Sequence, residues 1–169
     1  MVVLETSKGR IVLETDPDNA PITAENFEAY VRDGFYDGLI FHRVISNFMI
    51  QTGGFGPDME PRRPGAPIQN EADNGLSNKR GTIAMARTMS PHTASSQFFI
   101  NVNDNGFLDH TAKTQDGWGY CVFGRVLEGM DVVDSIRETP TTARAGHRDV
   151  PEEDIVIHQA RITGDKEDS

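Results

Sequence analysis

The chain has 169 residues, 37% hydrophobic and 25% charged, which suits a single globular domain built around one core. Its 16 basic and 26 acidic residues give a formal net charge of −10, so its average surface repels nucleic acid and anionic lipid headgroups. We therefore expect no nucleic acid and no membrane as a partner, and the start of the chain lacks the basic and apolar regions of a signal peptide, which favours a cytoplasmic protein.

The first predicted elements are a pair of antiparallel strands and a helix. Residues 2–6 and 10–15 each alternate apolar and polar side chains, and the Ser-Lys-Gly turn between them predicts a hairpin. Residues 24–33 carry apolar side chains at helical spacing, with Thr23 as a candidate N-cap and Gly34 as a stop.

Further strands are predicted along the rest of the chain, with a second helix at residues 130–138. The strand candidates are residues 39–45, 48–52, 81–86, 97–102, 120–126 and 154–163. Residues 54–80 are rich in glycine and proline and predict a long surface loop.

This series of elements predicts a mainly β fold. Eight strands and two short helices, without regular strand–helix alternation, favour a closed eight-stranded antiparallel β-barrel capped by two α-helices. We expect residues 1–163 to form this single domain and the polar tail, residues 164–169, to fray.

Motifs for metal or covalent chemistry are missing or incomplete. Residues 101–112 resemble a calcium-binding loop, but the first position is Asn and the twelfth is Ala instead of a bidentate Glu. The five histidines show no metal-ligand spacing, and the single cysteine, Cys121, lies in an apolar run typical of a buried thiol. The sequence has no GxSxG elbow and no phosphate-binding loop. We therefore expect no metal, no cofactor and no covalent intermediate.

One strand candidate contains an arginine among apolar residues, in the run FHRVI. Strand alternation places Phe41 and Arg43 on the same face. If the runs FMIQ and QFFIN pair beside it, one sheet face combines charged, amide and apolar side chains. These are Arg43, Met49, Gln51, Gln97 and Phe99.

Plain structural roles are the alternatives for this face, with Arg43 in an ion pair or at a strand edge and the apolar residues in the core. Buried glutamines need partners, which favours a binding role. On the pattern alone, the face supports a peptide- or ligand-binding site.

Three longer segments resemble the cyclophilins, the peptidyl-prolyl cis-trans isomerases, and in particular the short cytoplasmic bacterial type. The segments are FHRVISNFMIQTGG, GTIAMARTMSPHTASSQFFINV and GYCVFGRVLEGMDVVDSI. The resemblance extends over about residues 1–163. It implies a cyclophilin-like barrel and an isomerase that assists protein folding by rotating Xaa-Pro peptide bonds.

Carried over by position, the resemblance implies that Arg43 is the catalytic residue and that His42 beside it is structural. The substrate-binding positions correspond to Phe48, Met49, Gln51, Ala86, Arg87, Gln97, Phe99, Phe107, Leu108 and Tyr120. Three of them depart from the common pattern: Arg87 replaces an Asn, Phe107 replaces the Trp associated with cyclosporin binding, and Tyr120 replaces a His. We therefore expect isomerase activity with weak binding of cyclosporin.

The resemblance implies a reaction in which no bond is made. Arg43 would donate a hydrogen bond to the prolyl nitrogen, whose lone pair is available only while the peptide bond is twisted. The expected partners are proline-containing polypeptides, including unfolded or nascent proteins, and we expect a monomer.

Two alternative functions remain, and the first uses the same scaffold. The first is a proline-peptide binding module or chaperone with incidental catalysis. The second is a small-molecule-binding barrel of lipocalin type, which requires a hollow interior that Phe41, Phe98 and Phe123 would instead fill.

Overall fold

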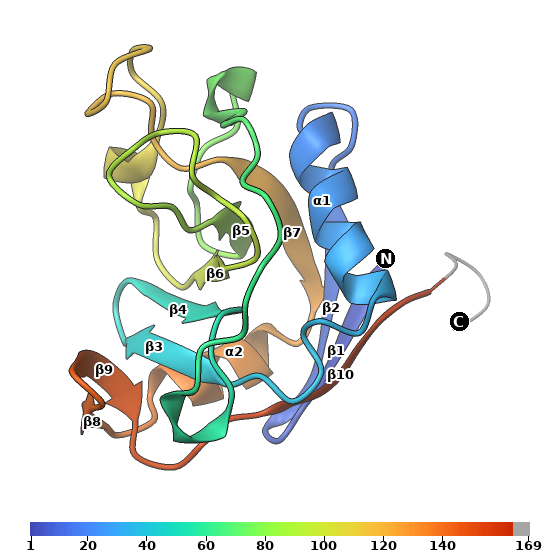
Figure 1. Cartoon of the computed structure of the whole chain (residues 1–169), viewed down its shortest axis with the longest axis vertical. Coiled ribbons are helices and arrows are strands. Elements are labelled where there is room, and N and C mark those ends of the chain that lie inside the picture. Colours follow the sequence, from blue (N-terminus) through green and yellow to red (C-terminus); the bar gives the residue numbers. More distant parts are fainter. Residues whose placement is uncertain (164–169) are drawn as a thin grey trace.

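The computed structural model describes residues 1–163, so the predicted frayed tail lies outside the described residues. Eight strands form one antiparallel sheet that curls into a barrel (Figure 1). They are β1 (Val2–Thr6), β2 (Gly9–Thr15), β3 (Phe41–Ile45), β4 (Met49–Thr52), β5 (Thr82–Met85), β6 (Phe98–Asn101), β7 (Val122–Glu128) and β10 (Ile157–Ile162). Their order in the sheet is β10-β1-β2-β7-β5-β6-β4-β3. The predicted eight-stranded antiparallel architecture is confirmed.

The barrel closes through a short contact between its two outermost strands. Ile40 and Val156, just before β3 and β10, form an isolated antiparallel bridge. The amide of Phe41 donates to the carbonyl of Ile155 at 3.0 Å, and the amide of Ile157 donates to that of Leu39 at 2.8 Å. The ladder is therefore not continuous around the barrel, and closure is less complete than the sequence predicted.

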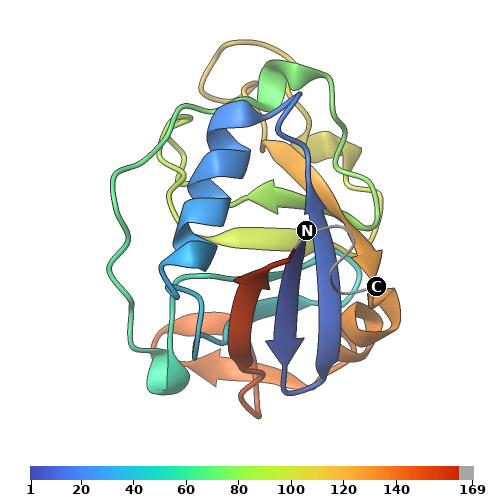
Figure 2. The same ribbon diagram turned by 90° about the vertical axis from the view of Figure 1, so that its right-hand side faces the viewer.

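Aromatic side chains fill the barrel interior. Phe27 from helix α1 (Pro21–Arg32) lies 5.0 Å from Phe98 and 5.1 Å from Phe123, measured between ring centroids. Phe27, Phe41, Phe98 and Phe123 are fully buried. Figure 2 shows α1 lying across the barrel beside β1 and β10. A packed interior does not match the hollow barrel required for a lipocalin-type binder.

Both predicted helices are present, although the first begins earlier than expected. Helix α1 begins at Pro21, because proline is well tolerated in the first helical turn, where its missing N–H needs no partner. Thr23 is therefore inside the helix and does not cap it. Its hydroxyl donates to Glu71 at 2.8 Å and joins the long loop to α1. Helix α2 (Met130–Arg137) matches the prediction to within one residue at its end.

A second, two-stranded sheet was not predicted. It consists of β8 (Thr141–Arg144) and β9 (His147–Pro151), joined by a turn in which Ala145 and Gly146 both have positive φ angles. Its residues are mostly exposed and polar, so they show no apolar alternation. Within residues 1–163, no helix is long and apolar enough to span a membrane.

A bulge interrupts the pairing of β3 with β4. Phe41 lies opposite Thr52 and Arg43 lies opposite Gln51, so His42 is one extra residue on β3. The bulge turns Phe41 into the core and leaves Arg43 on the outer surface. The prediction that Phe41 and Arg43 share a face was therefore wrong, because it assumed an unbroken alternation.

The bulged residue, His42, is buried without a hydrogen bond to its Nδ1. Its ring lies 4.7 Å from that of Phe55, which in turn lies 5.1 Å from the ring of His147 on β9. Burial, with smaller contributions from the nearby His147 and Arg43 side chains, lowers the pKa of His42 to about 4. The folded protein therefore holds His42 in its neutral form.

We predict that His42 makes the protein sensitive to mild acid. Because the folded pKa is depressed, the unfolded chain binds the proton more tightly, so stability falls as pH drops from about 6.5 towards 4. In urea titrations, the unfolding free energy of the wild type should fall between pH 6.5 and pH 4.5. The fall in His42→Leu should be smaller by about 2 kcal/mol, because this variant has no imidazole to protonate at position 42. His158→Gln, an exposed histidine on β10, is the matched control and should behave like the wild type. Equal losses in the wild type and His42→Leu would contradict this assignment.

Candidate active site

The strands that carry the predicted face are neighbours, as expected. Arg43 on β3 lies opposite Gln51 on β4, and Gln51 lies opposite Phe99 on β6. Directly paired residues point to the same side of a sheet, so these three side chains form a row on the outer surface of the barrel. The opposite sides of the same strands contribute Val44, Ile50 and Ile100 to the barrel core.

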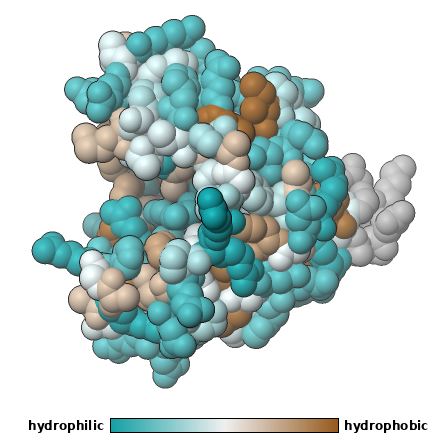
Figure 3. Space-filling view, viewed as in Figure 1, coloured by the Kyte–Doolittle hydropathy of each residue, from teal (hydrophilic) through white to brown (hydrophobic). Residues whose placement is uncertain are grey.

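The row lines a pocket of about 210 Å³. Its nine lining residues all belong to the predicted site, and they are Arg43, Phe48, Met49, Gln51, Ala86, Arg87, Phe99, Leu108 and Tyr120. Met49, Phe99 and Leu108 are almost completely buried and belong to a second apolar cluster, separate from the barrel core. The pocket thus has an apolar floor and polar groups on its walls. Figure 3 shows that this side of the molecule is hollowed between the β3–β4 region and the loops above it.

The two other predicted residues lie beside the pocket. Gln97 precedes β6, and its Oε1 accepts a hydrogen bond of 2.9 Å from Nε2 of Gln51. Gly54 leaves room for Gln97, since a Cβ at Gly54 would come within 2.6 Å of the Gln97 Cδ. Phe107 stacks on Phe48 with ring centroids 5.6 Å apart and is 77% exposed, so it forms an apolar rim.

A group of buried asparagines supports the pocket, and the sequence analysis did not identify it. Asn105 donates from Nδ2 to the carbonyl of Phe48 and to Oδ1 of Asn101, each at 2.8 Å. Asn101 in turn donates to Oδ1 of Asn78 at 3.0 Å. All three are at most 2% exposed. A signal was present, because Asn101 follows Phe99 by two residues and so falls on the pocket face of its strand.

The same network holds the turn that supplies Leu108, the short helix η3 (Gly106–Leu108). Asp109 follows it and accepts hydrogen bonds from the Ser77 hydroxyl at 2.5 Å and the Asn78 amide at 2.7 Å. Burial opposes ionisation of Asp109, but these hydrogen bonds hold its pKa below the usual value. Leu108 is therefore fixed from both the Asn105 and the Asp109 sides.

Arg87 and Tyr120 form the opposite wall. The guanidinium carbon of Arg87 lies 4.6 Å from the centroid of the Tyr120 ring. Nε of Arg87 donates at 2.9 Å to the carbonyl of Gly119. Gly119 has a φ of +76°, and a Cβ there would come within 2.6 Å of the Leu108 carbonyl. Glycine therefore allows the two segments to approach each other.

Groups suited to metal or thiol chemistry do not gather at this pocket. The described residues contain no group of three or more His, Cys, Asp or Glu side chains placed to hold a metal ion. Cys121 is buried, and burial raises the pKa of its thiol to about 11, which leaves it protonated at neutral pH.

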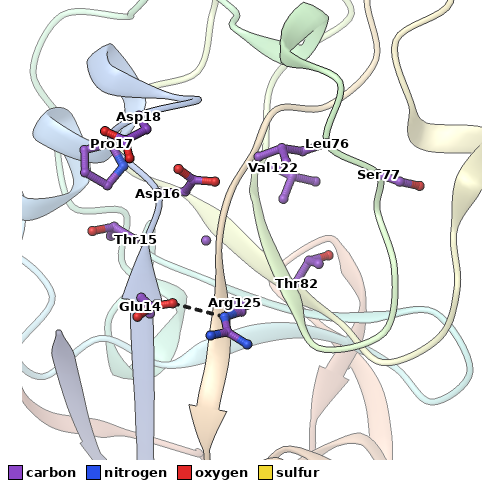
Figure 4. A pocket seen from close by; sticks show the side chains of 11 residues that line it. Glu14, Thr15, Asp16, Pro17, Asp18, Leu76, Ser77, Thr82, Val122 and Arg125 are labelled. Atoms are coloured by element: carbon purple, nitrogen blue, oxygen red, sulfur yellow. Dashed lines mark hydrogen bonds and ion pairs between the residues drawn. The ribbon is translucent and has the colours of Figure 1, made fainter.

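Four larger concavities formed by residues 1–163 lack this combination of residues. One of about 450 Å³ lies between the end of β2 and β7, where Glu14 and Arg125 form an ion pair of 3.0 Å (Figure 4). It shares only the wall residues Leu76 and Val122 with the second apolar cluster. Volume alone therefore does not distinguish the candidate pocket, whereas its grouping of arginines, amides and an apolar floor does.

The chain matches the family described as cyclophilin type peptidyl-prolyl cis-trans isomerase/CLD over residues 1–162. It is 63% identical over 163 residues to the peptidyl-prolyl cis-trans isomerase cyp18 of Streptomyces antibioticus, covering 96% of this chain and 98% of that protein. It is 53% identical to peptidyl-prolyl cis-trans isomerase B of Escherichia coli, covering 96% of this chain and 99% of that protein.

A solved structure agrees in fold. The crystal structure of a cyclophilin type peptidyl-prolyl cis-trans isomerase of Cryptosporidium parvum, determined in the presence of the dipeptide Ala-Pro, superposes with a TM-score of 0.80 at 26% identity. The match covers 97% of this chain and 99% of that one. The family match, the relatives and the fold agree, and the chain belongs to the cyclophilin-type peptidyl-prolyl cis-trans isomerases.

Proposed function

We propose that Arg43 is the catalytic group of this peptidyl-prolyl cis-trans isomerase and that the apolar floor of the pocket holds the proline ring. The observation that carries the proposal is the juxtaposition of the Arg43 guanidinium, which has no partner among residues 1–163, with a pocket of about 210 Å³ floored by Met49, Phe99 and Leu108. A volume of this order accepts a small apolar ring. The open position of the pocket on the barrel surface gives access to a proline within an extended polypeptide segment.

The reaction needs selective stabilisation of a twisted amide. Rotation about an Xaa-Pro bond has a barrier near 20 kcal/mol, because the C–N bond has partial double-bond character. Raising a rate of about 0.01 per second to about 10 per second requires lowering that barrier by roughly 4 kcal/mol. In the twisted state the prolyl nitrogen regains a lone pair, which accepts a hydrogen bond that the planar amide does not accept. A charged donor aimed at this nitrogen contributes about 1.5 to 3 kcal/mol.

Arg43 is available for this contact. Its side chain is exposed, and it forms no hydrogen bond or ion pair with any residue in the described part of the chain. A guanidinium stays charged throughout the neutral pH range, so catalysis by Arg43 needs no titrating acid or base. The remaining stabilisation of the twisted state comes from the apolar floor, which excludes water around the rotating bond.

The pair of glutamines is suited to hold the peptide backbone. Gln51 uses one N–H on Gln97, and this bond fixes both side chains. The side-chain Oε1 of Gln51 can then accept a hydrogen bond from the substrate's peptide groups, and the side-chain Nε2 of Gln97 can donate one to them. If the glutamines hold the backbone on one side of the Xaa-Pro bond, the part of the peptide on the other side is free to rotate.

The clients that we propose are unfolded or nascent proteins with accessible prolines, bound by a cytoplasmic monomer. The shallow, surface-exposed site supports this choice, since a proline within a folded core would not reach it. A binding module with incidental catalysis remains the alternative, and the following variant separates the two.

Arg43→Ala should lower kcat/KM on a short Ala-Pro peptide by about tenfold to a hundredfold, because the charged hydrogen bond to the twisted nitrogen is lost. NMR exchange spectroscopy of the cis and trans peptide signals measures this rate. Arg32→Ala, which removes an exposed arginine from α1, is the matched control and should leave the rate unchanged. Undiminished turnover in a folded Arg43→Ala protein would contradict the assignment, and negligible turnover in the wild type would favour a binding module.

Cyclosporin should inhibit the wild type weakly, because Phe107 stands where the family commonly has a Trp. Phe107 is exposed and contacts Phe48, so Phe107→Trp adds an N–H donor at the rim without disturbing the core. We predict at least a tenfold lower inhibition constant for Phe107→Trp, read from isomerase assays at increasing cyclosporin concentration. Phe107→Leu is the control and should bind no better than the wild type. Equal inhibition of wild type and Phe107→Trp would show that Phe107 does not limit binding.

A further inference from the structure

The pocket is lined by a second guanidinium, that of Arg87, which follows β5, whereas Arg43 lies on β3. Arg87 stacks on Tyr120, and Nε binds the Gly119 carbonyl. Its Nη1 donates to the carbonyls of Thr88 at 2.8 Å and Met89 at 3.3 Å. Three contacts to neutral carbonyls and one aromatic face hold the group in a single position.

These contacts leave the charge and one nitrogen of Arg87 available. Its Nη2 has no hydrogen-bond partner among residues 1–163, so two N–H groups remain free. The accepting groups are uncharged carbonyls, which orient the guanidinium without neutralising it. Because the side chain is already fixed, an ion pair formed with it costs little further conformational entropy.

The absence of a carboxylate partner distinguishes the two pocket arginines from most others. Several arginines in the described region form ion pairs with Asp or Glu, and these are Arg10, Arg32, Arg80, Arg125, Arg137, Arg144 and Arg161. Neither Arg43 nor Arg87 forms one with a described residue. The nine residues that line the pocket include these two positive charges and no acidic side chain. The pocket is therefore locally positive in a chain of net charge −10.

We propose that this isomerase prefers prolines that have an acidic residue immediately beside them, with Arg87 as the residue that determines the preference. The proposal rests on the function proposed above, which places the proline ring on the apolar floor of a pocket that both arginines line. The neighbouring residue is then one Cα step, about 3.8 Å, from the proline. Its side chain reaches the wall, where a carboxylate is attracted and an ammonium is repelled.

The test uses two sets of short peptides, one varied at the residue before proline and the other at the residue after it. Each set carries Glu, Gln or Lys at that position and is otherwise identical. Exchange spectroscopy gives kcat/KM directly and avoids a coupling protease, whose own preferences would distort the comparison. For the wild type we expect kcat/KM on the Glu peptide to exceed that on the Lys peptide by about fivefold in at least one set. A ratio of this size matches the contribution of an exposed ion pair.

Variants at position 87 identify the source of the preference. Arg87→Gln should reduce the Glu-to-Lys ratio to about twofold, since Arg43 keeps its charge. Arg87→Lys keeps the charge and should keep most of the ratio. Arg32→Gln removes the same charge from α1 and should match the wild type, which separates a local effect from one of net charge.

Two outcomes would overturn the inference. One is a Glu-to-Lys ratio near one in both peptide sets with the wild type, and the other is a ratio that stays the same in Arg87→Gln. In either case turnover of the Gln peptide would still report on the isomerase itself. Loss of that turnover in the wild type would instead count against the proposed function.

Discussion

The position of one guanidinium depends on a single extra residue in β3. The pairing of Phe41 with Thr52 and of Arg43 with Gln51 leaves His42 without an opposite residue. Unbroken pairing would give Arg43 the orientation of Phe41 and direct a charge into an aromatic core, which would carry a large desolvation penalty. The bulge resolves this conflict, since Phe41 keeps its place in the barrel and Arg43 moves to the surface. Its cost is visible in His42, which is buried with an unsatisfied nitrogen.

The rest of the pocket depends on buried amides. Asn78, Asn101 and Asn105 join the end of the long loop, strand β6 and the turn that carries Leu108. A buried polar network of this kind is favourable only when its members are satisfied together, so it specifies one arrangement of the loops. The apolar floor and the network thus play different roles, since the first presents an apolar surface and the second fixes the position of the segments around it.

Strand runs and the residues that line the pocket were largely predictable from the sequence, because alternation, turn residues and family motifs all mark them. Nine predicted residues line one pocket. Irregular features were harder to predict. The bulge at His42 leaves no compositional trace, β8 and β9 are too exposed to alternate, and α1 begins at a proline instead of at the expected Thr23 cap. The asparagine network depends on distant segments meeting, which a local pattern does not reveal. Arg87 shows the same limit, since only the structure reveals that its contacts leave the charge uncompensated.

The closure of the barrel has a consequence for the order of folding. Strand β1 lies between β2 and β10, and the amine of Met1 donates to the carbonyl of Thr163 across a separation of 162 residues. The bridge to β3 likewise needs Val156. During synthesis, β1 therefore leaves the ribosome with one edge unpaired, and that edge stays open until β10 has emerged. Contacts this distant in sequence also slow folding, because the loop they close must be ordered first. The barrel of this isomerase is thus completed only once β10 has been made.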